Sequence, residues 1–130
     1  MLGYLHDIGN CVNRTDHAHS GAIIAYNILK DMGMPVDERT EIMMAIGNHD
    51  ENTGTAVSDI SAALILADKS DVHRDRVTNT NLSTFDIHDR VNYAVTDAKL
   101  KIDKETRKII LNLKIDTKLC PVLDLSLIHI

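Results

Sequence analysis

Aromatic residues are scarce in this chain. They make up 3% of the 130 residues, and tryptophan is absent. The core must therefore be aliphatic, and the chain lacks a row of aromatic side chains that could stack on the bases of single-stranded nucleic acid. The formal net charge of −5 argues against broad binding to a phosphate backbone, which needs a basic surface. We expect no extended nucleic acid among its partners.

Cysteine and long apolar runs are also scarce. Cys11 and Cys120 are the two cysteines, too few for a disulfide framework and without the paired spacing of structural zinc sites. No stretch approaches the roughly 20 apolar residues of a membrane helix, and no leader pattern is present. The simplest interpretation is a soluble protein in the reducing cytoplasm, with no membrane partner.

The apolar residues that are present, within a hydrophobic fraction of 44%, follow helical spacing in the first half of the chain. Gly33 and Pro35 mark the end of the first helix, and the third helix is apolar nearly all round, which predicts deep burial. The expected helices run from Asp16–Ser20 to Asp31, from about Asp37 to His49, and from Ser58 to Asp68. The first is expected to bury Ala22, Ile23, Tyr26, Ile28 and Leu29.

The spacing of the apolar residues changes after a short predicted helix, for which Asp86 is the expected N-cap. Apolar and polar residues tend to alternate over 93–102 and 108–115, and residues 103–107 lie between them as turn material, which is typical of a β-hairpin. We therefore predict a mainly α fold with a helical domain over residues 1–92 and a hairpin extension over 93–116.

Both ends of the sequence are unusual. Residues 125–130 (LSLIHI) are what CTG TCT CTT ATA CAC ATC would encode, the end sequence of a transposase adaptor used in preparing sequencing libraries. We expect a translated adaptor there, with a natural apolar tail as the alternative, and exclude His129 from site arguments. Residues 1–5 are typical of the last turn of an apolar helix whose beginning is missing.

The dipeptide His-Asp occurs three times, as His6-Asp7, His49-Asp50 and His88-Asp89. The first is distinguished by its context, because it follows an apolar helix end and precedes Ile8-Gly9. Adjacent residues point apart within a helix, but at a helix end both can converge on one ion. An imidazole nitrogen and a carboxylate oxygen suit Fe, Mn, Co, Ni or Zn.

The segment Leu5-His6-Asp7-Ile8-Gly9 resembles the defining motif of the HD superfamily of metal-dependent phosphohydrolases. Asp68, in Ile65-Leu66-Ala67-Asp68-Lys69, resembles the distal aspartate of that family. His17, with Gly21 four residues later, and His49, at the end of Ala45-Ile46-Gly47-Asn48-His49, resemble the additional histidines of members with two metals. The resemblance covers residues 2–77 and is closest to the bacterial branch that contains the symmetrical diadenosine tetraphosphatases.

The resemblance implies an HD-type helical bundle that cleaves a phosphoester or phosphoanhydride bond of a nucleotide or dinucleotide with a metal-activated water. Two divalent transition-metal ions are implied, with Mg²⁺ as a further candidate. Asp7 would be catalytic and bridge the ions. His6 and Asp68 would hold one ion, and His17 and His49 the other. Lys69 would be catalytic and contact the substrate phosphate, together with Arg74 and Arg76.

The match has departures. Asn10 stands where the family often has lysine, Lys69 stands where the diadenosine branch tends to have an aromatic residue, and no Gly-Tyr-Pro follows His49. Family members also carry a histidine ligand before the His-Asp pair, and no residue precedes Met1. We therefore expect an incomplete metal site and little activity from the fragment.

Simpler interpretations remain open for each residue. Asp68 can be satisfied by backbone groups at a helix end, His17 and His49 can be caps or surface residues, and His19 is an alternative ligand to His17. Ion pairs with Asp71 and Asp75 compete with a phosphate-binding role for Arg74 and Arg76. We expect His73 and His88 on loops or caps.

The alternative function is a catalytically silent HD domain used for ligand sensing or assembly, and a homo-oligomer is compatible with either function.

Overall fold

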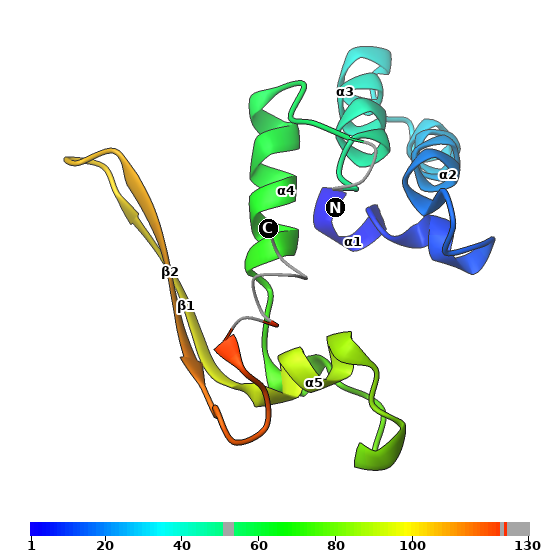
Figure 1. Cartoon of the computed structure of the whole chain (residues 1–130). Coiled ribbons are helices and arrows are strands. Elements are labelled where there is room, and N and C mark those ends of the chain that lie inside the picture. Colours follow the sequence, from blue (N-terminus) through cyan, green and yellow to red (C-terminus); the bar gives the residue numbers. More distant parts are fainter. Residues whose placement is uncertain (51–53, 123, 125–130) are drawn as a thin grey trace. The chain divides into compact units, whose positions relative to one another are not determined.

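The chain forms mainly helices followed by one C-terminal hairpin (Figure 1). The computed structural model describes residues 1–50, 54–122 and 124, so the predicted adaptor at 125–130 lies outside the described residues. The elements are α1 (Leu2–Leu5), the 3₁₀ helix η1 (Ile8–Cys11), α2 (His17–Asp31), α3 (Val36–Gly47), α4 (Asp59–Ser70), η2 (Arg74–Arg76), η3 (Leu82–Thr84), α5 (Ile87–Ala94), β1 (Val95–Asp103) and β2 (Lys108–Ile115). The prediction of a mainly α chain with a C-terminal hairpin is confirmed.

The chain divides into two compact units, Met1–Asp68 and Lys69–Ile130. The boundary falls inside α4, within the range predicted for the helical domain, residues 1–92. None of the helices in the described ranges has the length and apolarity of a membrane span.

The predicted helix ends have clear local causes. Gly33 has a φ of 80°, and the amide of Met34 donates to the carbonyl of Leu29 (3.0 Å), the pattern of a glycine C-cap. Ser58 accepts a hydrogen bond from the amide of Ser61 (3.2 Å) and so caps α4 as predicted. These caps fix where α2 ends and where α4 begins.

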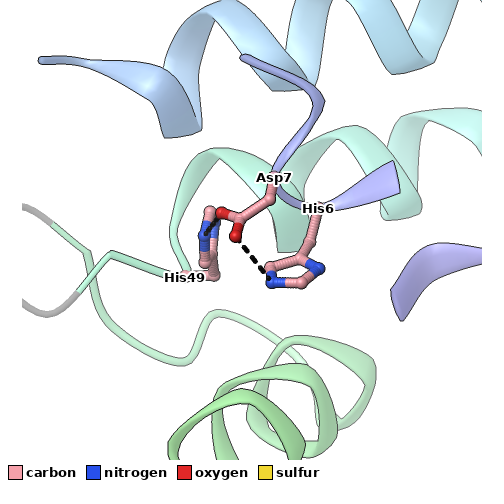
Figure 2. A group of neighbouring side chains, drawn as sticks. All are labelled: His6, Asp7 and His49. Carbon is pink, nitrogen blue, oxygen red and sulfur yellow. Dashed lines mark ion pairs between the residues drawn. The ribbon is translucent and has the colours of Figure 1, made fainter. Parts of the chain in front are cut away.

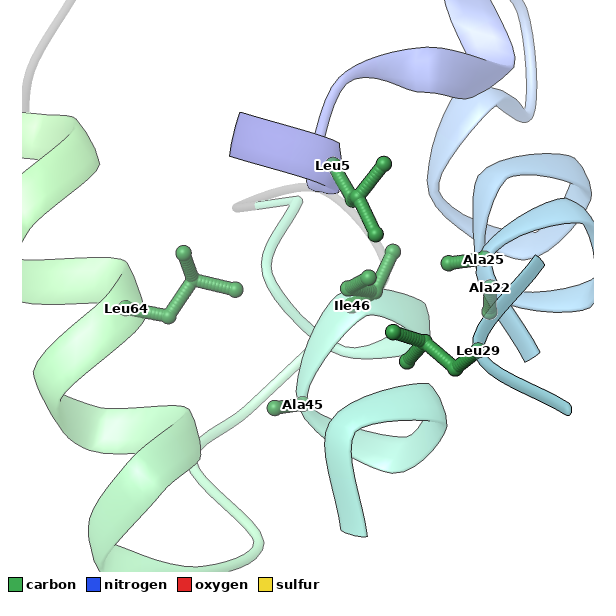
Figure 3. Packing of buried hydrophobic residues seen from close by; sticks show 7 residues of the cluster. All are labelled: Leu5, Ala22, Ala25, Leu29, Ala45, Ile46 and Leu64. Carbon is green, nitrogen blue, oxygen red and sulfur yellow. The ribbon is translucent and has the colours of Figure 1, made fainter. Parts of the chain in front are cut away.

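Small side chains build the core of the first unit (Figure 3). The alanines of α2 and α3 allow these two helices to approach closely, and leucine and isoleucine side chains fill the remaining space. The buried residues are Leu5, Ala22, Ala25, Leu29, Ala45, Ile46 and Leu64.

Two predictions about burial are wrong. Ile23 is 62% exposed, because the buried face of α2 runs through Ala22, Ala25 and Leu29 and its neighbour Ile23 points away. Within α4 only Ser61 and Leu64 are buried, so this helix is not deeply buried. The helix carries apolar side chains nearly all round, but the described part of the chain covers only one stripe of its surface.

The second unit has its own small core and an antiparallel hairpin. The core consists of Val72, Val91, Ala94, Val95 and Cys120. Asp86 caps α5 as predicted, accepting a hydrogen bond from the amide of Asp89 (2.8 Å). Because α5 continues to Ala94, β1 begins two residues later than predicted. Across the hairpin, Leu100 lies opposite Leu111 and Ile102 opposite Ile109.

Candidate metal centre

Three histidines of the first unit share one side-chain arrangement. In each, Nδ1 is hydrogen-bonded to the backbone carbonyl three residues earlier: His6 to Gly3 (2.8 Å), His17 to Arg14 (3.1 Å) and His49 to Ile46 (2.6 Å). A carbonyl only accepts, so Nδ1 must carry the hydrogen and Nε2 of a neutral ring keeps its lone pair. This is the tautomer in which metal-binding histidines are commonly held.

The three Nε2 atoms face the carboxylate of Asp7, and Figure 2 shows two of them, on His6 and His49, on either side of it. Oδ1 of Asp7 lies 3.3 Å from Nε2 of His17 and 3.6 Å from Nε2 of His49. Oδ2 lies 3.6 Å from Nε2 of His6, which is in turn 3.4 Å from Oδ1 of Asp68. Asp7 therefore contacts both a first donor set, His6 with Asp68, and a second donor set, His17 with His49. The two sets adjoin, because the ring centroid of His49 lies 5.1 Å from those of both His6 and His17.

The spacing of these atoms fits a metal ion. Two ligands bound at about 2.1 Å to one ion lie about 3.0–3.4 Å apart at octahedral or tetrahedral angles. The Nε2 to carboxylate distances here are 3.3 to 3.6 Å. One donor atom from each of His6, Asp7 and His49 can be chosen so that all lie within 4.8 Å of one another. The donors could close on an ion through small side-chain adjustments.

The chemistry of the donors also demands a positive charge. Nε2 of His6 is buried and makes no hydrogen bond of good geometry. Lone pairs of neutral imidazoles and of a carboxylate repel one another unless a proton or a cation lies between them. His49 is 2% exposed, so water does not relieve this repulsion there. The residues present therefore fit a divalent cation.

Without a metal, protons supply this charge. The Asp68 carboxylate, with the Gly3 carbonyl and Asp7, raises the pKa of His6 against the opposing effect of burial. Burial lowers the pKa of His49, but the Asp7 carboxylate and the Ile46 carbonyl outweigh it and the net shift is upward. The pairing with His49 and the charges of His6 and His17 hold the pKa of Asp7 below its usual range, against the opposing effect of burial.

Two glycines bring the His-Asp segment against α2. A Cβ atom on Gly9 would lie 1.9 Å from the carbonyl oxygen of His17 and 2.6 Å from the amide nitrogen of Gly21. A Cβ atom on Gly21 would in turn lie 3.1 Å from the amide nitrogen of Gly9. Only glycine permits such close backbone contact, so the glycines of both sequence motifs have a packing role that holds Asp7 near His17.

The structure thus places five predicted metal ligands together: His6, Asp7, His17, His49 and Asp68. Their role as ligands stays a prediction. His19 lies outside this group, where its exposed ring is paired with Asp16. Sequence reasoning missed Asp50, whose Oδ2 lies 3.6 Å from Nδ1 of His17. The available signal was the second His-Asp dipeptide.

The predicted phosphate-binding cations belong to the second unit. The guanidinium of Arg74 lies over the ring of Tyr93, 5.2 Å from its centroid. Nε of Arg76 lies 3.6 Å from Oδ2 of Asp71, the ion pair that the simpler interpretation expected. Lys69 follows Asp68 directly on α4. The role of all three cations in substrate binding stays a prediction.

No family model, curated protein or solved structure matches this chain in the three comparisons made. The resemblance to the HD superfamily therefore depends on the quoted motifs alone.

Proposed function

We propose that this chain is an HD-type phosphohydrolase domain that uses two divalent metal ions to cleave a phosphoester or phosphoanhydride bond. The observation that supports it most directly is the position of Asp7, whose two carboxylate oxygens face the histidines of both donor sets. A carboxylate in this position suits a bridge between two ions, the arrangement of many two-metal hydrolytic sites.

Each residue of the centre has a definite task in this proposal. His6 and Asp68 would hold one ion, and His17 and His49 the other. Nitrogen and carboxylate donors together favour Mn, Fe, Co, Ni or Zn over Mg, which prefers an all-oxygen shell. Ions bound there would neutralise phosphate oxygens and lower the pKa of water toward about 7.

Burial differs across the centre in a way that suits catalysis. The side chain of Asp7 is 49% exposed, whereas that of His49 is 2% exposed. The carboxylate of Asp7, which would bridge the ions, is therefore open to an approaching substrate, and its histidine partner is held in the protein interior. Charge neutralisation and alignment are the main requirements of phosphoryl transfer. The resemblance would give the phosphate contact to Lys69, with Arg74 and Arg76 as further cations.

The substrate class follows from the resemblance. The motif order is that of the diadenosine tetraphosphatase branch, so we propose a nucleotide or dinucleotide as the small phosphorylated substrate. The exposed and buried free cysteines fit a reducing compartment, and we place the protein in the cytoplasm.

Metal content and hydrolysis, measured together, test the proposal. The chain is stripped with a chelator and reloaded with Mn²⁺, and the release of phosphate from a panel of nucleotides and dinucleotides is followed. We expect a low rate of metal-dependent hydrolysis that is lost in Asp7→Asn, with Asp16→Asn as the control of equal charge change. A chain that binds no metal would refute the proposal. Metal binding without turnover of any substrate would favour the catalytically silent domain.

A further inference from the structure

The second His-Asp dipeptide, His49-Asp50, lies just after α3, and its two side chains reach different atoms of one donor set. Nε2 of His49 is 3.6 Å from Oδ1 of Asp7. The carboxylate of Asp50 approaches His17 from the other side of its ring, with Oδ2 3.6 Å from Nδ1. One dipeptide therefore contacts both histidine positions of the second donor set.

His17 differs from the other two histidines on its Nδ1 side. Its bond to a backbone carbonyl is the longest of the three, at 3.1 Å against 2.8 and 2.6 Å. Among the ion pairs of the described residues, Nδ1 of His17 alone in this trio has a carboxylate beside it. A carboxylate at this position fixes the orientation of a metal-binding ring and strengthens its donor nitrogen.

Backbone contacts hold Asp50 in place. Its carbonyl oxygen accepts a hydrogen bond from the amide of Gly54 (2.8 Å). Gly54 also packs closely on Asn48, because a Cβ atom at Gly54 would lie 2.2 Å from the carbonyl oxygen of Asn48. The Asp50 side chain is 21% exposed. Its carboxylate is thus held beside His17 by the local fold.

We propose that Asp50 is a positioning residue for the second ion: its carboxylate holds the His17 ring so that Nε2 faces Asp7. The inference rests on the proposed function, since it supposes that His17 and His49 bind a metal. It adds a residue that would act on one ion by orienting a ligand and would not bind the metal itself. Loss of Asp50 should weaken the ion held by His17 and His49 and spare the ion held by His6 and Asp68.

Mn²⁺ binding to the whole chain, measured by calorimetric titration after chelator treatment, tests this inference. We expect two classes of site in the unaltered chain. Asp50→Ala should weaken one class about 10- to 100-fold and leave the other within about twofold. Asp50→Glu should recover part of the loss. Asp31→Ala, an exposed acidic residue at the end of α2, controls for net charge, and thermal unfolding confirms that each variant folds.

A double-mutant cycle separates positioning from a general structural effect. If Asp50 acts through His17, Asp50→Ala should cause no further loss of Mn²⁺ affinity in a His17→Ala background. Additive losses would overturn the inference, as would equal weakening of both classes or unchanged binding in Asp50→Ala. An unaltered chain that binds no Mn²⁺ refutes the proposed function and this inference together, whereas two sites insensitive to Asp50→Ala refute this inference alone.

Discussion

The backbone of Gly9 touches the backbone of His17 so closely that no side chain fits between them: a Cβ atom on Gly9 would lie 1.9 Å from the carbonyl oxygen of His17. This contact fixes the distance between the segment that carries Asp7 and the first turn of α2. The candidate metal centre therefore depends on a residue that would contribute no ligand atom.

Gly9→Ala should destabilise the first unit, because a backbone clash of this size forces η1 away from α2. Overpacking of a tight contact costs about 1–3 kcal/mol or more, and Mn²⁺ affinity should fall because His17 moves away from Asp7. Urea unfolding and metal titration measure the two effects. Gly3→Ala is the matched control, since a Cβ atom on Gly3 meets nothing within 4 Å. Equal stability of the two variants would contradict the packing role of Gly9.

The pH dependence of the metal-free chain follows from the direction of three pKa shifts. The pKa values of His6 and His49 are raised, so their stabilising contribution is fully present below about pH 6.5, the ordinary histidine value, and is lost as the pH rises through the raised values. The pKa of Asp7 is lowered, so its contribution is present above about pH 4 and is lost as the pH falls through the lowered value.

Stability of the metal-free chain should therefore be greatest between about pH 4 and about pH 6.5 and decline as the pH rises further. Urea unfolding in the presence of a chelator measures this profile. Asp7→Asn should flatten it, because the carboxylate of Asp7 contributes to the raised pKa of both His6 and His49. A profile that rises steadily from acid to alkaline pH would contradict the assigned shifts.

Local signals explain what the sequence could predict. The positive φ of Gly33 and the caps at Ser58 and Asp86 depend on residues within a turn of the helix ends, and these ends were predicted correctly. The residues of the candidate metal centre were singled out through a motif, and the structure places them together. Burial depends on which neighbour covers a helix face, so Ile23 and most of α4 were assigned wrongly. The second His-Asp dipeptide drew attention to Asp50, but its proximity to His17 arises from tertiary contact between the segment after α3 and α2.

The helix cap of the second unit provides an independent test of the fold. Asp86→Ala removes the acceptor for the amide of Asp89 and should cost about 1 kcal/mol of stability. The five predicted ligands all lie in the first unit, so Mn²⁺ affinity should not change. Chemical unfolding and metal titration of the same sample measure both quantities. A loss of affinity would show that the metal centre depends on the second unit.

Metal binding should raise the thermal stability of the first unit. An ion that binds only the folded chain stabilises it by about 2.7 kcal/mol at a free concentration about 100 times Kd, roughly 10 °C in Tm for a domain of this size. His6→Gln removes the Nε2 donor that is buried without a hydrogen bond of good geometry. Its Tm should therefore respond much less to Mn²⁺, because one ion loses a ligand.

His19→Gln is the matched control, since the side chain of His19 is 55% exposed and pairs with Asp16 away from the centre. This variant should keep the full rise in Tm, and scanning calorimetry with and without Mn²⁺ compares the two directly. Equal rises in both variants would mean that Mn²⁺ binds elsewhere on the chain. A response lost in His6→Gln and kept in His19→Gln would locate the ion at the His-Asp pair, because the two substitutions remove the same kind of side chain and differ only in position.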